Sequence, residues 1–208
     1  MGFFSRFRKK QEDENPNRWF EVREAHYSKF LGPIDEKIAH STDVQEVHID
    51  IYTFPPTDKR WYWTLITGGM SDKHQNIPED ATDISGRTEL IMYVEEPKGW
   101  IYNVLKTLAE MPFKEKTFFY WYHTVLYGEP MMPEPSELTS VFFLPPCFEK
   151  PKFDTLQIAG EKVNILWVVP ITEREREYVI QEGNAALIDV FQKAEMDPMI
   201  DEKRKSLI

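Results

Sequence analysis

The chain has 208 residues, of which 41% are hydrophobic and 14% aromatic, so it carries enough apolar surface for a folded domain with one hydrophobic core. Its formal net charge of −10 argues against nucleic acid as a partner, because a negative field repels phosphates. The only cysteine, Cys147, excludes an intrachain disulfide and a CxxC metal site. We interpret Cys147 as a packing residue and expect a reducing, cytoplasmic environment. Apolar runs fall short of the ~18 residues that span a bilayer, so stable membrane insertion is not expected.

The first elements in chain order are a tail, a helix and a strand. Residues 1–17 combine phenylalanine with arginine and lysine and are otherwise polar, so we expect a flexible tail, with a weak contact to a membrane surface as the alternative. Apolar side chains recur at helical spacing over residues 20–31, and Gly32 and Pro33 follow them. Residues 47–52 alternate apolar and polar side chains, which predicts a strand with one buried face.

The middle of the chain predicts two further strands and the clearest helix. Residues 61–67 and 88–94 are rich in aromatic and β-branched side chains, and the polar residues 70–86 between them are predicted to form a long surface loop. Apolar residues recur at i, i+3, i+4 and i+7 over residues 101–108, which places one apolar stripe against a sheet. Pro112 is expected to end this helix.

The last third of the chain predicts more strands and a second helical region. Short strands are expected at residues 117–125, which are dense in aromatics, and at 141–144 and 153–158. Residues 163–169 are apolar on both faces and should lie centrally in the sheet, ending at Pro170. Thr172 and Glu175 have the spacing of a capping box, which predicts that a helix begins there. The charged residues 197–208 are expected to form a frayed tail.

This order of elements decides the fold class. Helix, strands, helix, strands and helix is not the strict alternation of a doubly wound parallel sheet. We therefore predict an α/β (α+β) fold, a mixed β-sheet flanked by helices. It should form a single domain over residues 18–196, between the two tails.

The sequence offers little for catalysis. Its one double glycine, Gly68 and Gly69, lacks the GxGxxG or GxxxxGK[ST] context of a phosphate-binding loop, and no GxSxG motif is present. His48 and Asp50 are two residues apart on a predicted strand and so share a face, where His123 from a neighbouring strand would complete the metal site of a hydrolase. Ordinary hydrogen bonding on a polar face is the alternative. We prefer that alternative and expect no catalytic residue, metal or cofactor.

Five segments, in this order along the chain, resemble the suppressor-of-fused domain family. They are residues 48–57 (HIDIYTFPPT), 62–72 (YWTLITGGMSD), 87–94 (RTELIMYV), 141–146 (VFFLPP) and 165–172 (ILWVVPIT), the last followed by a glutamate-rich helix. The resemblance runs from about Arg18 to about Ala194. An ordered series of motifs is more specific than any one of them.

The resemblance implies a mixed-sheet domain that binds another protein and is not an enzyme. In animals, the namesake of the family restrains transcription factors of the Hedgehog pathway by holding a peptide between this domain and a second, C-terminal one. The present chain is similar to the stand-alone bacterial members, which have been proposed as immunity proteins that neutralise toxins. The expected partner is therefore a toxin domain or a regulatory peptide, and the acidic charge of the chain suits a basic partner.

We expect the partner to bind at a sheet edge, by β-strand addition, or at the loop of residues 70–86. Met70 and Asp72 begin that loop and Glu89 lies on the strand that follows it, so these three are the candidate interface residues. Each has a structural alternative: Met70 fills a gap in the core, Asp72 caps a turn and Glu89 pairs within the sheet.

Overall fold

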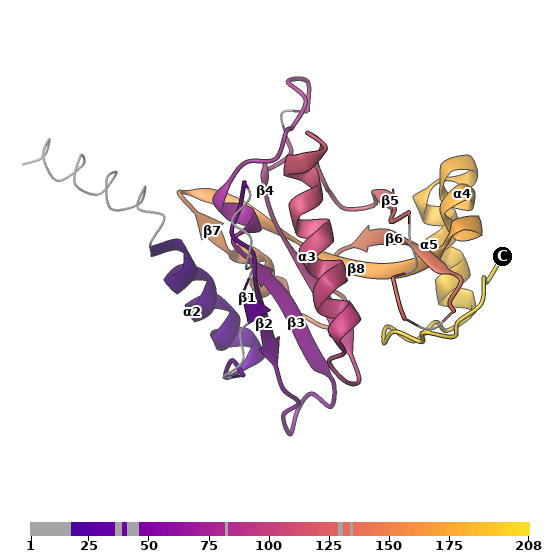
Figure 1. Ribbon diagram of the computed structural model, residues 1–208, viewed down its shortest axis with the longest axis horizontal. Helices are drawn as coiled ribbons and strands as arrows, with labels where there is room; N and C mark the ends of the chain where they lie inside the picture. The colour runs from indigo at the N-terminus through magenta and orange to yellow at the C-terminus, as the bar shows by residue number, and fades with distance from the viewer. Residues whose placement is uncertain (1–17, 36–38, 41–45, 82, 129–130, 134) are drawn as a thin grey trace, which may run out of the picture.

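The computed structural model describes residues 18–35, 39–40, 46–81, 83–128, 131–133 and 135–208 (Figure 1). In chain order its elements are α2 (Trp19–Leu31), β1 (Ala39–His40), β2 (Asp50–Phe54), β3 (Trp63–Gly68), the 3₁₀ helix η2 (Met70–Asp72), β4 (Arg87–Val94), α3 (Gly99–Lys114), β5 (Thr124–Leu126), β6 (Leu138–Leu144), the 3₁₀ helix η3 (Pro151–Thr155), β7 (Gln157–Ile158), β8 (Glu161–Thr172), α4 (Glu173–Glu182) and α5 (Asn184–Lys193). The predicted N-terminal tail, residues 1–17, lies outside the described residues.

The strands form one open mixed sheet in the order β1-β2-β3-β4-β8-β6-β5, and β7 pairs with the start of β8. β4 and β8 run parallel, and every other neighbouring pair is antiparallel. The predicted fold class, a mixed sheet flanked by helices, is confirmed. β8 lies between β4 and β6, as the apolar character of both its faces predicts.

Each face of the sheet carries its own apolar cluster, because successive side chains of a strand point to opposite faces. Leu65 of β3 packs in one cluster with the buried stripe of α3, whereas its neighbour Ile66 packs in the other with Tyr27 of α2 and Phe191 of α5. Figure 1 shows α3 crossing one face of the sheet, with α2 at one end of the molecule and α4 and α5 at the other. Every residue of β4 is buried between these layers, as are residues 163–172 of β8.

Two prolines lie inside elements that they were expected to end. α3 continues for two residues beyond Pro112, where the missing N–H removes a single helical bond and the Pro112 carbonyl accepts a bond from Thr117 at 2.9 Å. β8 continues through Pro170, which stands opposite Val141 of β6. The Pro170 carbonyl accepts a hydrogen bond from Arg204 at 3.2 Å, so the backbone groups of this proline face away from β6 and no ladder bond requires its N–H.

Other local predictions are wrong in extent. Residues 117–125 form a strand only at β5, because Tyr122 adopts a left-handed φ of 69° two residues before it. Residues 153–158 form the end of the 3₁₀ helix η3 and the two-residue strand β7. Cys147, expected to pack inside, is exposed because it lies in the loop after β6.

The capping box at the start of α4 is confirmed and also holds the C-terminal segment. The Thr172 hydroxyl accepts from the Glu175 N–H at 3.2 Å, and the Glu175 carboxylate accepts from the Thr172 N–H at 2.8 Å. The same carboxylate binds Arg204 Nη2 at 2.8 Å and the N–H of Leu207 at 3.1 Å. Charge alone predicts a loosely held end for residues 197–208, whereas these bonds place it against the body. The domain boundary at residue 196 stays a prediction.

Candidate functional site

The three predicted interface residues, Met70, Asp72 and Glu89, come together where β3 ends. β3 ends at Gly68, and Gly69 then adopts a φ of 101°, a conformation that residues with a side chain rarely adopt. This turn leads into η2, which contains Met70 and Asp72 and packs against β4, the strand that carries Glu89. The double glycine therefore shapes a turn over β4. As the sequence showed, it is not part of a GxGxxG or GxxxxGK[ST] motif.

Glu89 is fully buried, and its carboxylate holds the turn in place. Oε1 accepts from the N–H of Gly69 at 3.1 Å, from the N–H of Ser71 at 3.0 Å and from the Ser71 hydroxyl at 2.6 Å. Oε2 accepts from the Thr67 hydroxyl at 2.7 Å. An ionised carboxylate can accept hydrogen bonds but cannot donate one, and these four donors use both of its oxygens.

Arg23 of α2, which sequence reasoning missed, supplies the positive charge of this cluster. Its Nε lies 4.0 Å from Glu89 Oε1, and its Nη1 pairs with Asp72 Oδ1. Arg23 is only 3% exposed because it occupies the buried stripe of α2 with Tyr27 and Leu31, at i, i+4 and i+8. A charged residue on an otherwise apolar helical stripe was the available signal, since such a charge requires a buried partner.

The charges of the pair depend on each other. Burial raises the pKa of Glu89, while Arg23 and the hydrogen bonds from Ser71 and Thr67 act against that rise. Burial likewise disfavours the charge of Arg23, but Glu89 and Asp72 outweigh burial and raise the pKa of Arg23 above its ordinary value. Loss of Arg23 would leave the buried Glu89 without its nearby positive charge, whereas loss of Glu89 would leave the buried Arg23 to pair with the partly exposed Asp72.

Of the three predicted interface residues, Asp72 is the one with accessible surface. Met70 and Glu89 are both 0% exposed, whereas the side chain of Asp72 is 34% exposed. Met70 packs in the apolar cluster with Leu65 and Leu90. Packing by Met70 and hydrogen bonding by Glu89 are thus what the structure shows, and an interface role for the three residues stays a prediction.

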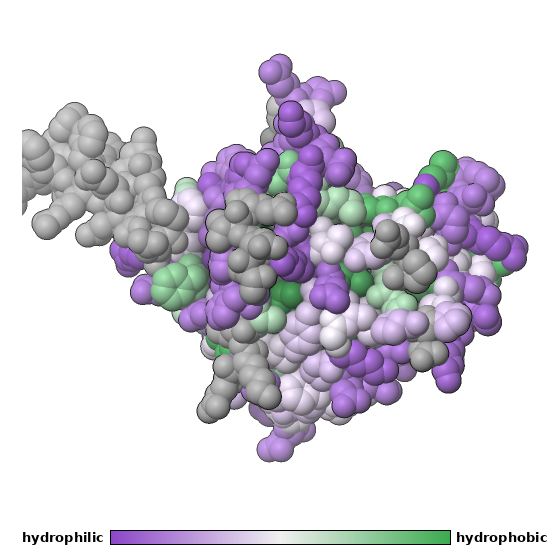
Figure 2. Space-filling model, viewed as in Figure 1, coloured by the Kyte–Doolittle hydropathy of each residue, from purple (hydrophilic) through white to green (hydrophobic). Residues whose placement is uncertain are grey.

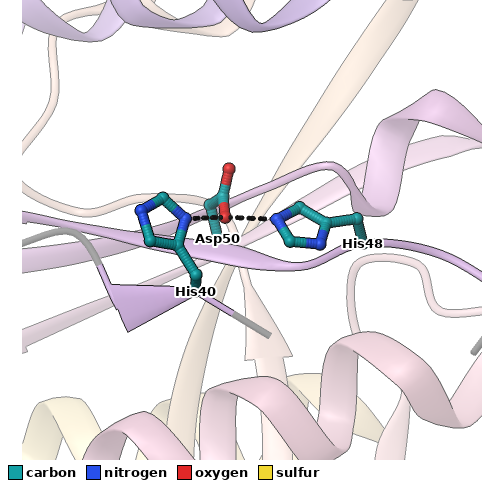
Figure 3. Close-up of side chains that lie close together, drawn as sticks. All are labelled: His40, His48 and Asp50. Atoms are coloured by element: carbon teal, nitrogen blue, oxygen red, sulfur yellow. Dashed lines mark hydrogen bonds and ion pairs between the residues drawn. The ribbon is translucent and has the colours of Figure 1, made fainter. Parts of the chain in front are cut away.

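A metal site of His48, Asp50 and His123, the less favoured of the two interpretations of these residues, is contradicted by the position of His123. His48 and Asp50 do meet, with Nε2 of His48 2.9 Å from Oδ1 of Asp50. His123 precedes β5, which lies at the opposite edge of the sheet from β1 and β2, five strand spacings or on the order of 20 Å away. The third side chain at this place is His40 of β1, whose Nδ1 lies 2.7 Å from the same Asp50 oxygen (Figure 3). A hydrolase centre that needs His123 is excluded by this distance.

The edge of the sheet at β5 is a second candidate surface. β5 pairs with β6 on one side, and among the described residues no strand pairs with its other side. Leu126 of β5 is 48% exposed and Ile180 of the adjacent helix α4 is 65% exposed. Figure 2 shows hydrophobic surface in this region of the molecule, over β5 and α4. An open strand edge beside exposed apolar side chains is a typical docking surface for an extended segment.

By its fold, the chain is a single α/β domain built on an open mixed sheet. The turn after β3, at Gly68 and Gly69, lies beside the buried pair of Arg23 and Glu89. Residues 45–205, more than half of the chain, match the family described as suppressor of fused protein (SUFU). The chain belongs to this family.

Solved structures of the family share the fold at low sequence identity. A SUFU homologue from Neisseria gonorrhoeae FA 1090 superimposes with a TM-score of 0.71 at 18% identity, covering 91% of this chain and 97% of that one. The Sufu–Fu complex gives a TM-score of 0.66 at 14% identity, covering 91% of this chain and 92% of that one. Drosophila Suppressor of Fused gives 0.56 at 14% identity, covering 77% of this chain and 42% of that one. The comparison with curated proteins returned no match.

Among the described residues, no helix has the length and apolar character needed to cross a membrane.

Proposed function

We propose that this chain is a non-catalytic protein-binding domain that takes up an extended segment of its partner as an added strand beside β5. The observation that carries the proposal is the open outer edge of β5, next to exposed Leu126 and Ile180. Membership of the SUFU family supports it, since a related fold has been solved in a complex named Sufu–Fu.

The register of β5 fixes which of its backbone groups an added strand would meet. The carbonyl of His123 and the N–H of Tyr127 both bond to β6. Backbone groups of alternate residues point to opposite sides in an antiparallel ladder, so those of Thr124 and Leu126 face outward. An incoming strand would bond to these two residues, while its side chains would contact the apolar surface made by Leu126 and α4.

A finer proposal is that the chain is an immunity protein that neutralises a toxin domain in the bacterial cytoplasm. Its net charge of −10 complements a basic toxin and would speed their association. Its one cysteine suits a reducing compartment. Asp72, held in place by Arg23 and backed by Met70 and Glu89, is proposed as a further acidic contact for such a partner.

Strand addition is tested by a proline at the outward-facing position. Leu126→Pro removes the outward N–H without touching the ladder to β6, whereas Leu126→Thr removes the leucine side chain but keeps the donor and suits a strand. We expect Leu126→Pro to weaken binding of the purified partner at least tenfold in calorimetry, and Leu126→Thr to weaken it less. Equal affinities of the two variants and the wild type, at equal thermal stability, would exclude β5 as the interface.

The immunity role needs a separate experiment, because a regulatory partner would bind as well. Where the neighbouring reading frame encodes a toxin domain, that domain is produced in cells with the wild type, with Leu126→Pro, or alone. We expect growth to be restored by the wild type and not by the proline variant. Growth arrest that persists in the presence of soluble wild-type chain would reject the immunity role and leave the strand-addition result standing on its own.

A further inference from the structure

We propose that His40, His48 and Asp50 form a binding site for one divalent transition-metal ion, with Zn²⁺ as the best fit. The three residues are called the histidine cluster below. The proposal is independent of the protein-binding function, since the cluster lies at the edge of the sheet opposite β5.

The backbone brings the three side chains to one point. His40 is the second residue of β1 and stands directly opposite Asp50 of β2 in the strand register, and His48 comes two residues before Asp50. The possible ligand atoms of all three lie within 4.8 Å of one another. Figure 3 shows both imidazole rings directed at the carboxylate from opposite sides.

The contacts within the cluster are those that a bound ion would replace. His40 Nδ1 at 2.7 Å and His48 Nε2 at 2.9 Å both approach the same oxygen, Asp50 Oδ1. Without an ion each ring nitrogen donates a hydrogen bond to that oxygen through its N–H, whereas a metal ion would accept lone pairs from all three atoms. Bonds of about 2.1 Å separate tetrahedral ligand atoms by about 3.4 Å, so the cluster must open by about half an ångström. Rotation of the two exposed rings supplies that movement.

The ligand types select the metal. Two imidazole nitrogens and one carboxylate oxygen suit Zn²⁺ and its neighbours Ni²⁺ and Cu²⁺, whereas Mg²⁺ and Ca²⁺ require oxygen ligands. His40 is 60% exposed and His48 48% exposed at their side chains, so an ion here would keep at least one position for water or for a ligand from another molecule. The acidic chain also raises the local concentration of cations.

Two of the three ligands are held firmly and the third is not. Asp50 is paired on both sides, with His40 and with Gly68, and its side chain is only 18% exposed. The carbonyl of His48 packs against Gly69 so closely that a Cβ there would lie 1.9 Å from it. His40 belongs to a strand of two residues, which backbone pairing alone holds weakly. A metal ion would therefore clip β1 onto β2.

The test uses the full chain without a polyhistidine tag, stripped of metal and titrated with Zn²⁺ in a calorimeter. We expect one Zn²⁺ per chain, at least tenfold weaker binding in His40→Ala and in His48→Ala, and no uptake of Mg²⁺. The matched control is His74→Ala, because His74 forms an exposed pair with Glu161 at 2.9 Å that has the same chemistry without a second histidine. Its affinity should equal that of the wild type.

A spectroscopic readout decides the matter even if a variant fails to fold. Zn²⁺ added to the wild type should shift the ring resonances of His40 and His48 and leave those of His74 in place, and Co²⁺ should give the visible absorption of a site with few ligands. Binding should weaken at acidic pH, since protons compete for the imidazole nitrogens. Absence of Zn²⁺ uptake at about 100 μM, where a site with a Kd of about 10 μM would be mostly filled, would overturn the proposal. So would uptake that shifts neither His40 nor His48.

Discussion

Two polar clusters meet at the Gly68–Gly69 turn, and they differ in burial. The buried cluster consists of Arg23, Asp72 and Glu89, whereas the histidine cluster consists of His40, His48 and Asp50. Asp50 pairs with Gly68, and the carbonyl of His48 packs on Gly69, so the two clusters share one turn of backbone. Glu89 is 0% exposed, whereas the histidine side chains are about half exposed or more.

This difference separates polar side chains that hold the structure together from those that are free to bind a ligand. Both oxygens of Glu89 are used by four donors that belong to the turn itself, so the group cannot leave without unfolding its surroundings. Asp50 instead receives both histidines on a single oxygen. The first arrangement fixes a shape, and the second can exchange its partners for an ion.

The largest effect is expected from Glu89→Ala. It leaves four buried backbone and hydroxyl donors without their acceptor and leaves Arg23 to pair with the partly exposed Asp72, so we expect a loss of about 4 kcal/mol in the free energy of unfolding. Urea denaturation monitored by tryptophan fluorescence measures it. The control is Glu46→Ala, which removes a carboxylate from an exposed pair with Lys73 and should leave the free energy of unfolding almost unchanged. Similar losses for the two variants would mean that burial does not separate these clusters.

The shared turn is tested by Gly69→Ala, for which we expect a loss of about 3 kcal/mol, because a positive φ and a steric clash add together. Gly160→Ala is the matched control: Gly160 also has a positive φ, of 79°, but nothing lies within 4 Å of its Cβ position. That variant should cost only about 1 kcal/mol. Equal costs would show that the His48 carbonyl yields easily and that the turn does not hold the histidine cluster.

Sequence reasoning predicted the parts of the fold that depend on local patterns. The central place of β8 follows from apolar side chains on both faces, and the start of α4 follows from the spacing of Thr172 and Glu175. What it missed depends on contacts between distant residues. Pro170 is tolerated because of Arg204, which lies on a segment expected to be frayed. The spacing of apolar side chains along the sequence cannot reveal such a contact.

The candidate sites divide in the same way. Met70, Asp72 and Glu89 were rightly placed near one another, since a loop and the following strand are adjacent along the chain. The positive charge beside Glu89 and Asp72 comes from Arg23, on a helix some fifty residues earlier in the sequence, 49 positions from Asp72. His48 lies two residues before Asp50, which begins β2, so the predicted strand of residues 47–52 starts later than expected. Choosing His40 over His123 required knowledge of which strands form the two edges.

A third carboxylate, Glu175, tests the comparison through pH. Burial acts to raise the pKa of Glu175, but Arg204 and the backbone donors outweigh it and hold the pKa below the ordinary value of 4.5. A lowered pKa in the folded chain means stability that is present above pH 4.5 and lost as the pH falls through the folded-state value. We expect Glu175→Gln to be about 1–2 kcal/mol less stable at pH 7 and to lose that deficit below pH 4, as measured by urea denaturation at each pH. A deficit that stays constant from pH 7 to pH 3 would show that shape, not charge, holds the C-terminal segment.

The smallest effect on stability is expected when one residue of the histidine cluster is replaced in the metal-free chain. His40→Ala and His48→Ala each remove an exposed ring from a carboxylate that keeps its backbone pairing, so the free energy of unfolding of the metal-free chain should change by less than about 0.5 kcal/mol. Urea denaturation in the presence of a chelator measures it. Glu89→Ala acts at the other side of the same turn, where it removes a buried acceptor of four hydrogen bonds, so the contrast between about 4 and 0.5 kcal/mol separates a buried cluster from an exposed one. A loss above about 2 kcal/mol in either histidine variant would place the histidine cluster with the structural residues, and the distinction between a cluster that fixes shape and one that is free to bind would no longer hold.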